Sequence, residues 1–234
     1  MTLQAVHGKR TDILLGALDI REWFESLDID TTVTSGDATT FGHNWKVNIV
    51  GLATGKVAAG GFYDPAFTAI KSSLMAAADE IVTTGMDGFA LGAMVDLIAG
   101  ITVNYKESAK LGSVVAFAWS LDADDILSQS FVTHALAAEA APGDTGDADA
   151  GSSSTDGMVA HIHLTALTGG DSVTFDLDDS PDGASWTTRA TVTLSGVGGA
   201  RLSKRGTVAR HTRIAWSGEA DPITFLTALG RGKV

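Results

Sequence analysis

The last third of the chain constrains the fold most, because short runs of alternating apolar and polar residues recur there between glycine, aspartate and proline turns. In the first run, Met158–Leu167, His161 and His163 fall on one side and aliphatic residues on the other. Further runs cover 172–177, 185–194, 207–217 and 223–229, and a flexible loop is expected at 196–199. Runs of this period predict β-strands, and the turns between them indicate a sandwich or barrel.

Before these runs lies the segment AEAAPGDTGDADAGSSSTDG, residues 138–157, which has almost no bulky apolar side chain. Such a composition buries too little apolar surface to order a chain, so we expect a flexible acidic linker at 141–157. The linker separates a β-rich part at 1–140 from an all-β part at 158–234. The sequence leaves open whether the two parts are separate modules or complete one another's sheets.

The first part is expected to contain an N-terminal polar arm, a long polar loop and several strands. The arm covers residues 2–12, and the loop covers 28–44. Strands are expected at 45–51, 56–62, 79–84, 101–108 and 113–121. One helix is predicted at about 65–78, because Asp64 can cap it, Pro65 suits its first turn, and apolar residues recur at helical spacing.

The charge of the chain limits its partners. The formal net charge is −12, with 8 basic and 17 acidic residues in 1–140 and 8 basic and 7 acidic residues in 158–234. This balance argues against ordinary nucleic-acid binding, which uses lysine and arginine to neutralise phosphates. No cysteine is present, which excludes disulfides and thiolate sites, and we expect no membrane segment.

Catalytic, cofactor and metal sites are not expected. His161 and His163 have the i, i+2 spacing of two zinc ligands, but two polar residues on a solvated or interface strand face are the favoured interpretation. The aspartates of 176–182 lack the spacing of a calcium loop and suit a hairpin turn. No pair of residues has the pattern of a nucleophile with its base. We therefore do not expect the chain to be an enzyme.

The basic residues near the end of the chain and three tryptophans can also be assigned places from the sequence. The basic residues of 201–213, Arg210 among them, are expected to pair with acidic surfaces of neighbouring copies. Trp45, Trp119 and Trp216 lie among apolar residues and are expected in the core.

Several short motifs together resemble the tail tube (major tail) proteins of long-tailed bacteriophages. The motifs are His7-Gly8-Lys9 with Thr11, Thr39-Thr40-Phe41-Gly42, Lys46 with Gly51-Leu52, and Asp64-Pro65. The resemblance continues through 105–124 and the pattern DSPDGASW…TVARHTRIAWSG…ITFLTALGR. It implies a mainly β, tail-tube-like sandwich or barrel with one or two short helices, followed by a second β-sandwich part.

The resemblance also implies a function. A tail tube protein is a structural virion protein whose rings, of six copies or of three two-module copies, stack into the conduit for DNA ejection. It would be assembled in the host cytoplasm, with the tape-measure, tail-terminator and tail-tip proteins as partners, and DNA would pass an acidic lumen without specific binding. The residues expected at the self-assembly interface are His7, Lys9, Arg10, Thr39, Phe41 and Arg210. The alternative is a carbohydrate- or receptor-binding β-sandwich of a virion or cell surface.

Overall fold

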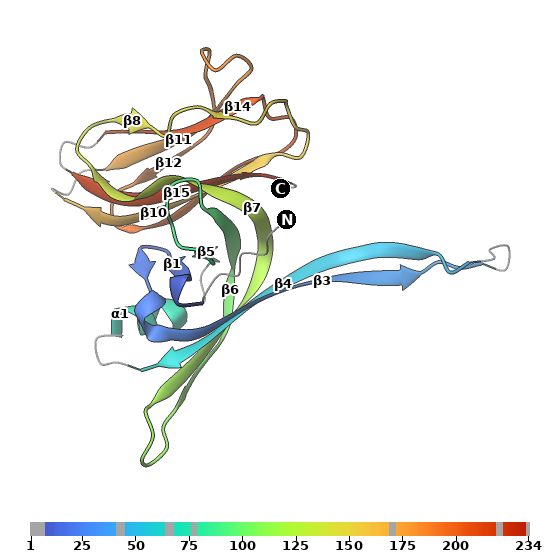
Figure 1. Cartoon of the computed structure of the whole chain (residues 1–234), viewed down its shortest axis with the longest axis vertical. Coiled ribbons are helices and arrows are strands. Elements are labelled where there is room, and N and C mark those ends of the chain that lie inside the picture. The colour runs from blue at the N-terminus through green and yellow to red at the C-terminus, as the bar shows by residue number, and fades with distance from the viewer. Residues whose placement is uncertain are drawn as a thin grey trace, which may run out of the picture. The chain divides into compact units, whose positions relative to one another are not determined.

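The computed structural model describes residues 8–40, 45–63, 68–75, 79–168, 172–218 and 222–232. Strands dominate them, so the predicted mainly β fold is confirmed. The chain folds as two compact units (Figure 1). Unit 1 comprises 1–22, 80–99 and 126–234, and unit 2 comprises 23–79 and 100–125. Strands β6 (Met94–Ser108) and β7 (Ala116–Glu139) each run from one unit into the other.

Unit 1 is built on two sheets. The first follows the order β13-β10-β15-β7-β6-β5-β1-β2. Its further strands are β1 (Asp12–Leu15), β2 (Leu18–Asp19), β5 (Asp79–Gly85), β10 (Met158–Leu167), β13 (Gly198–Lys204) and β15 (Ile223–Arg231). The second sheet has the order β12-β11-β14-β8, and β9 also pairs with β14. Its strands are β8 (Gly143–Asp144), β9 (Ala148–Asp149), β11 (Val173–Ser180), β12 (Thr187–Leu194) and β14 (His211–Ser217).

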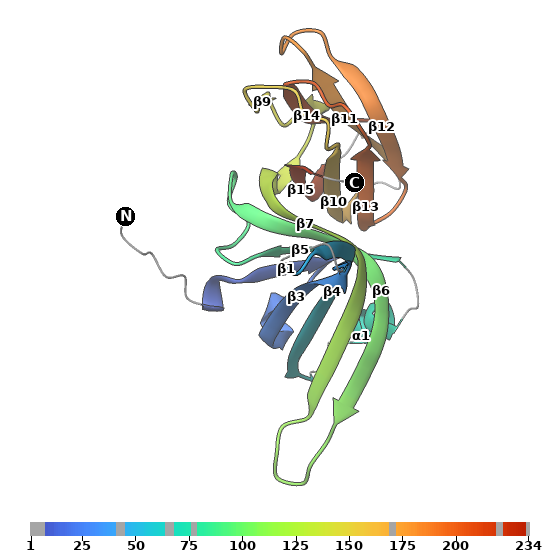
Figure 2. The same cartoon turned by 90° about the vertical axis from the view of Figure 1, so that its right-hand side faces the viewer.

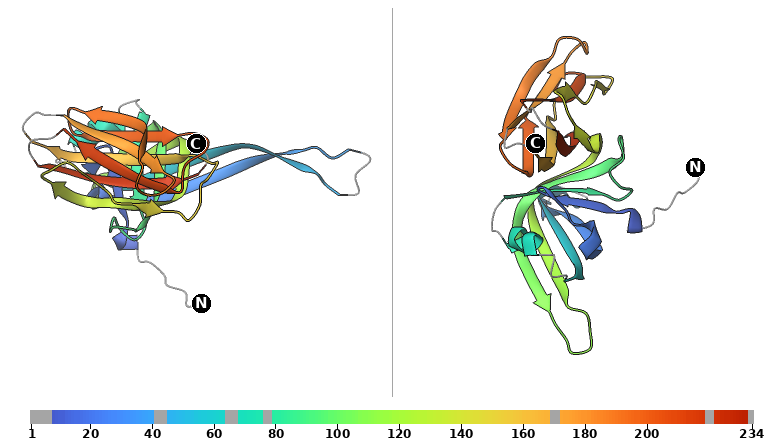
Figure 3. Two further views of the ribbon diagram at one scale, coloured as in Figure 1. Left: turned by 90° about the horizontal axis from the view of Figure 1, so that it is seen from above. Right: turned by 90° about the vertical axis from the view of Figure 1, so that its left-hand side faces the viewer.

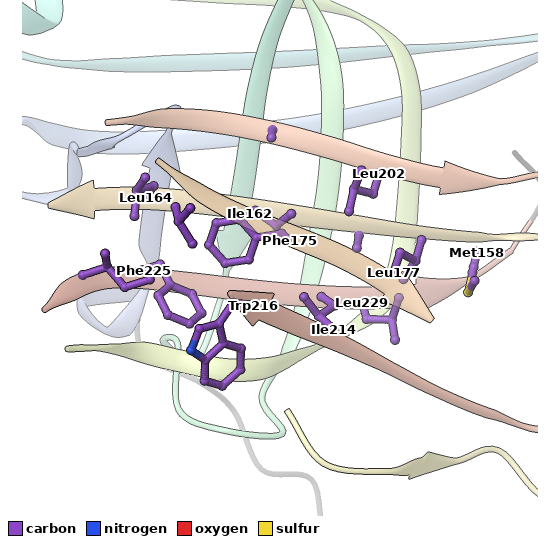
Figure 4. Close-up of a cluster of buried hydrophobic side chains, with 14 of the residues drawn as sticks. Met158, Ile162, Leu164, Phe175, Leu177, Leu202, Ile214, Trp216, Phe225 and Leu229 are labelled. Carbon is purple, nitrogen blue, oxygen red and sulfur yellow. The ribbon is translucent and has the colours of Figure 1, made fainter. Parts of the chain in front are cut away.

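Alternating side chains of these strands form the main core of unit 1 (Figure 4). Phe175 and Phe225 are fully buried, with ring centroids 5.2 Å apart in an edge-to-face arrangement. The predicted strand at 158–167 is confirmed as β10, but it is buried on both faces. Its second face joins another cluster that includes Leu14, Val95 and Leu226. Strands on both sides of the predicted linker therefore share one sheet, since β15 pairs with β7.

The segment predicted to be a flexible linker is held along β14 instead. Gly143 and Asp144 pair with β14 as β8, and Ala148 and Asp149 pair with it as β9. Two ion pairs reinforce this pairing, Arg213–Asp144 at 3.0 Å and Arg210–Asp149 at 2.5 Å, and His211 Nδ1 lies at hydrogen-bond distance from Asp147 Oδ2, 2.8 Å away. The segment lacks a core of its own, and its acidic residues instead contact basic residues that follow about sixty positions later in the sequence.

Unit 2 is a sheet of β3 (Phe24–Asp37), β4 (Asn48–Phe62) and parts of β7 and β6, with the helix α1 (Thr68–Met75) (Figure 2). The cross-strand pairs Val57↔Leu121 and Ala59↔Trp119 place four buried side chains on one face. The indole N–H of Trp119 donates to Thr102 at 2.9 Å. Helix α1 falls within the predicted 65–78, and its predicted cap at Asp64 and Pro65 lies outside the described residues.

Three sequence expectations are corrected in the strands. The predicted loop at 28–44 is largely strand β3, and the two strands expected at 45–51 and 56–62 are the single strand β4. The loop expected at 196–199 leads into β13, where a Cβ on Gly199 would lie 2.9 Å from the Cα of Gly16. Glycine at 199 therefore permits a close approach of two backbones that no side chain pattern reveals.

Candidate self-assembly surface

The β3–β4 hairpin extends far beyond the sheet that supports its base. β4 pairs with β7 only from Gly55 to Phe62, whereas β3 and β4 pair with each other as far as Asp37↔Asn48. We call residues 31–37 and 48–54 the distal ribbon. Figures 1 and 3 show it as a long two-stranded extension of unit 2. At the usual rise per residue, its seven residues per strand span about 23 Å.

Large apolar side chains are exposed along this hairpin. The exposed fractions are 54% for Val33, 61% for Ile49, 82% for Leu52 and 86% for Trp45. Trp45 was predicted in the core, and that prediction is wrong, whereas Trp119 and Trp216 are buried as expected. A two-stranded ribbon without cover is only marginally stable in water, so exposed apolar groups of this size indicate a surface that a partner covers.

The outer end of the hairpin is closed by side-chain hydrogen bonds. Thr39 donates its backbone N–H to Asp37 Oδ1 at 2.9 Å, and its hydroxyl accepts from the N–H of Val47 at 2.9 Å. Hydrogen bonds from Thr39 hold the pKa of the Asp37 carboxyl below its ordinary value. Thr39, predicted at the interface, thus shapes the end of the ribbon.

The base of the hairpin carries charges without an ion-pair partner. Lys56 of β4 is paired with Asp30 of β3 on one side and with Asp122 of β7 on the other. Asp28 lies two residues before Asp30 in β3 and therefore on the same face. Asp28 and Asp30 are exposed, and neither forms an ion pair among the described residues. The inner half of β3 therefore presents a net negative face.

The β6–β7 hairpin leaves the opposite end of the same sheet. Its turn, residues 109–115, exposes Leu111 completely and Val114 to 65%. Below the turn, Lys71 of α1 binds Glu107 at 2.6 Å, and Tyr105 donates its hydroxyl to Glu107 at 2.8 Å. These contacts brace the hairpin against the helix.

Of the remaining predicted interface residues, Lys9, Arg10 and Arg210 are among the described residues of unit 1. His7 and Phe41 lie outside the described residues. Lys9 and Arg10 belong to the 3-10 helix η1 (Gly8–Arg10), and Arg10 pairs with Asp87 at 2.8 Å. Arg210 was expected to meet a neighbouring copy, and here its guanidinium pairs with Asp149 of its own chain. Its contact with a neighbour stays a prediction.

The two strand histidines are buried rather than solvated. Thr83 Oγ1 lies 2.7 Å from His163 Nε2 and 3.2 Å from His161 Nδ1, and His163 Nδ1 donates to the carbonyl of Gly16 at 2.6 Å. Burial lowers the pKa of His163 to about 4, and burial, followed by the neighbouring His163 and the charge of Arg201, lowers the pKa of His161 well below its ordinary value. Within the described ranges, no three His, Asp or Glu side chains are grouped to hold a metal ion.

The other motifs also have structural roles. Asp182 Oδ1 accepts from the N–H groups of Ala184 and Ser185 at 3.0 and 2.8 Å, as expected for a turn. A cavity of about 480 Å³ is lined by Leu91, His134, Glu139 and Trp216 among others. Trp216 is only 6% exposed and donates its N–H to a backbone carbonyl, so it offers no aromatic platform to a sugar. None of the helices in the described ranges has the length and apolar composition to cross a bilayer.

No protein-family model and no curated protein matches the chain. It is similar to a solved structure of the virion of a native gene transfer agent particle, at 11% identity and TM-score 0.43, over 53% of this chain and 98% of the other. It is also similar to the Dit protein of phage SPP1, a hub adsorption protein, at 11% identity and TM-score 0.38, over 94% and 99% of the two chains. For the tail tube of SPP1 the values are 9% and 0.44, over 53% and 79%.

Tail tube proteins, the family indicated by the sequence motifs, are thus among the structures to which this chain is similar. The similarity lies below a TM-score of 0.5 throughout, so the function proposed next rests on the geometry of the chain itself.

Proposed function

We propose that this protein is a structural subunit of a phage tail that binds copies of itself to build rings, which stack into a tail tube. The distal ribbon carries the proposal: it has two strands only, and Val33, Ile49 and Leu52 are exposed on it. The motifs shared with tail tube proteins support the same function.

Strand edges are the second support. Within the described residues, β3 pairs with β4 alone, so its outer edge presents backbone N–H and C=O groups along a strand of 14 residues. Such an edge is a template for a strand of another molecule. A repeated edge-to-edge contact between identical copies closes into a ring when its rotation allows, and otherwise continues as a filament.

The number of copies in a ring, the charge of the lumen and the partner proteins are part of the same proposal. Rings of six copies, or of three copies that each supply two modules, would enclose a lumen through which DNA is ejected. The excess of acidic residues in 1–140 would give that lumen a negative field, which repels the phosphate backbone. The tape-measure, tail-terminator and tail-tip proteins would be its partners, and the assembled protein would reside in the virion tail.

The test compares Leu52→Asp with the control Leu91→Asp. Both leucines are exposed, to 82% and 70%, but Leu91 belongs to unit 1. Loss of one buried leucine from each contact costs about 2 kcal/mol, or roughly thirtyfold in association. We expect rings or tubes in negative-stain micrographs of the wild type and the control, and folded monomers for Leu52→Asp. A wild type that stays monomeric at high concentration in light scattering overturns the proposal.

Phe41 was predicted as an apolar anchor between rings, and this stays a prediction. Phe41→Asp should stop stacking and leave a folded subunit. Tubes of normal length from that variant would contradict the assignment.

A further inference from the structure

The turn of the β6–β7 hairpin combines exposed apolar side chains with positive charge. Leu111 and Val114 are exposed, and Lys106 and Lys110 stand beside them, also exposed. The described residues provide no ion pair for either lysine, and Glu107, next to Lys106 in the sequence, is bound by Lys71 at 2.6 Å. The turn is therefore an apolar tip with two unneutralised cations.

Side-chain contacts with helix α1 and between β6 and β7 support the base of this tip. Tyr105 stacks on Phe117 with ring centroids 6.2 Å apart, and the ammonium group of Lys71 lies 5.9 Å from the Tyr105 ring. A tip held in place by a helix and a stacked pair loses little conformational entropy when it binds, which favours a docking role.

The β3–β4 hairpin has the complementary chemistry. Leu52 is exposed to 82% on it, and Asp28 and Asp30 carry negative charges that lack an ion-pair partner among the described residues. Lys56, paired in register with Asp30, shares the face of Asp28 and Asp30, and Leu52 lies four residues before Lys56 on β4, at the register shift between Val33 and Ser35. The hairpin therefore carries exposed apolar surface and carboxylates within a few residues of one another.

One chain cannot bring the two surfaces together. β4 and β7 are antiparallel, with Gly55↔Ala123 at one end of their pairing and Phe62↔Ala116 at the other. The distal ribbon continues from the first end, whereas the 109–115 tip continues from the second. The two hairpins thus leave opposite ends of one sheet, as Figure 2 shows for β6 and β7 and Figure 1 for β3 and β4.

We propose that the 109–115 tip of one copy docks on the β3–β4 hairpin of the next, with Leu111 against Leu52 and with Lys106 and Lys110 facing Asp28 and Asp30. The inference rests on the proposed self-assembly and names the surfaces that meet. The contact is head-to-tail, so each copy has one tip and one acceptor free for further neighbours. Opposite charges steer the encounter, and the leucines supply the buried area.

The absence of cysteine from the sequence allows a direct test. Leu111→Cys and Leu52→Cys are made in separate chains, mixed and oxidised, and the control mixture pairs Leu111→Cys with Leu91→Cys. A disulfide forms only when two Cα atoms come within about 7 Å. We expect a covalent heterodimer in the first mixture at about tenfold the yield of the control, because docking raises the effective concentration of the thiols.

Charge exchange provides the second readout. Lys110→Glu should weaken assembly about fivefold, and Lys110→Glu with Asp30→Lys should restore it, since an exposed ion pair contributes up to about 1 kcal/mol. This docking is wrong, while the proposed function stands, if the wild type assembles but Leu111→Cys forms no more disulfide with Leu52→Cys than with Leu91→Cys. The same holds if two Leu111→Cys chains form a disulfide with each other. If the wild type does not assemble, both are overturned.

Discussion

Acid should destabilise unit 1 at the buried histidine pair, and the loss should begin above the pH at which exposed carboxylates titrate. His161 and His163 are 1% and 0% exposed, and the groups around them are Thr83, the carbonyl of Gly16, the backbone of Val82 and the cation Arg201. Among these, no anion faces the rings to stabilise a second positive charge. The neutral imidazole is therefore the form that folding favours.

The sign and size of the effect follow from the pKa shift. Burial lowers the pKa of His163 from 6.5 to about 4, so the stabilising contribution is complete above pH 6.5 and is lost as the pH falls toward 4. With 1.36 kcal/mol per pKa unit, the loss from His163 alone is about 2 kcal/mol at pH 5 and about 3 kcal/mol at pH 4. The pKa of His161 is also lowered, which adds to this loss.

The assay is urea unfolding followed by circular dichroism at pH 7.5 and pH 5.0, on the wild type and on His163→Gln. The variant should be less stable at pH 7.5, because it loses the buried contacts with Thr83 and Gly16. Between the two pH values, however, it should lose about 2 kcal/mol less than the wild type. An equal loss in both proteins would refute the idea that His163 is neutral because it is buried. Asp149 and Asp182, whose pKa values are lowered by hydrogen bonds, would lose stability only at lower pH.

Three further substitutions test other parts of the structure. Asp179→Ala should cost about 3 kcal/mol, because this 1%-exposed carboxylate accepts from Arg189 at 2.7 Å; a urea midpoint within error of wild type would contradict the pairing. Gln129→Gly should leave stability unchanged or raise it by up to about 1 kcal/mol, since Gln129 has a φ of 62° within β7; a clear drop in melting temperature would argue against strain there. Arg210→Ala should change global stability little, because the pair is exposed, but speed amide exchange around Asp149; unchanged exchange would mean that the ion pair does not hold the segment.

Most strands of the last third were predictable because β10, β11, β14 and β15 bury one face or both, whereas β13 was missed. β10 matches its predicted bounds, and β11, β12, β14 and β15 lie within a few residues of theirs. Alternation reveals such strands, since every second side chain must enter a core. The sheet partners were not predictable in the same way: β15 pairs with β7 across 141–157, and periodicity carries no information about which strands meet.

The candidate assembly surface was found only in part, for a related reason. β3 has mostly exposed residues on both sides, so its sequence shows no alternation and resembles a polar loop. Trp45 lies among apolar neighbours and resembles a core residue, although it is 86% exposed. A surface that a second molecule covers has the composition of a core or of a loop, and a single chain gives no sign of which applies. The sequence does place Leu111 beside Gly112 at a turn, and the structure shows this leucine completely exposed.

The charges on β3 reconcile an open strand edge with controlled assembly. A long edge with exposed apolar side chains would pair with many strands, and native proteins limit this with charged residues. β3 carries Glu25, Asp28, Asp30 and Asp37, so edge pairing between two β3 strands would place carboxylates opposite one another. A surface with free lysines, such as the 109–115 tip, escapes this repulsion. The same acidic residues would therefore exclude β3-to-β3 pairing and admit the head-to-tail contact, and it is that contact which can continue around a ring.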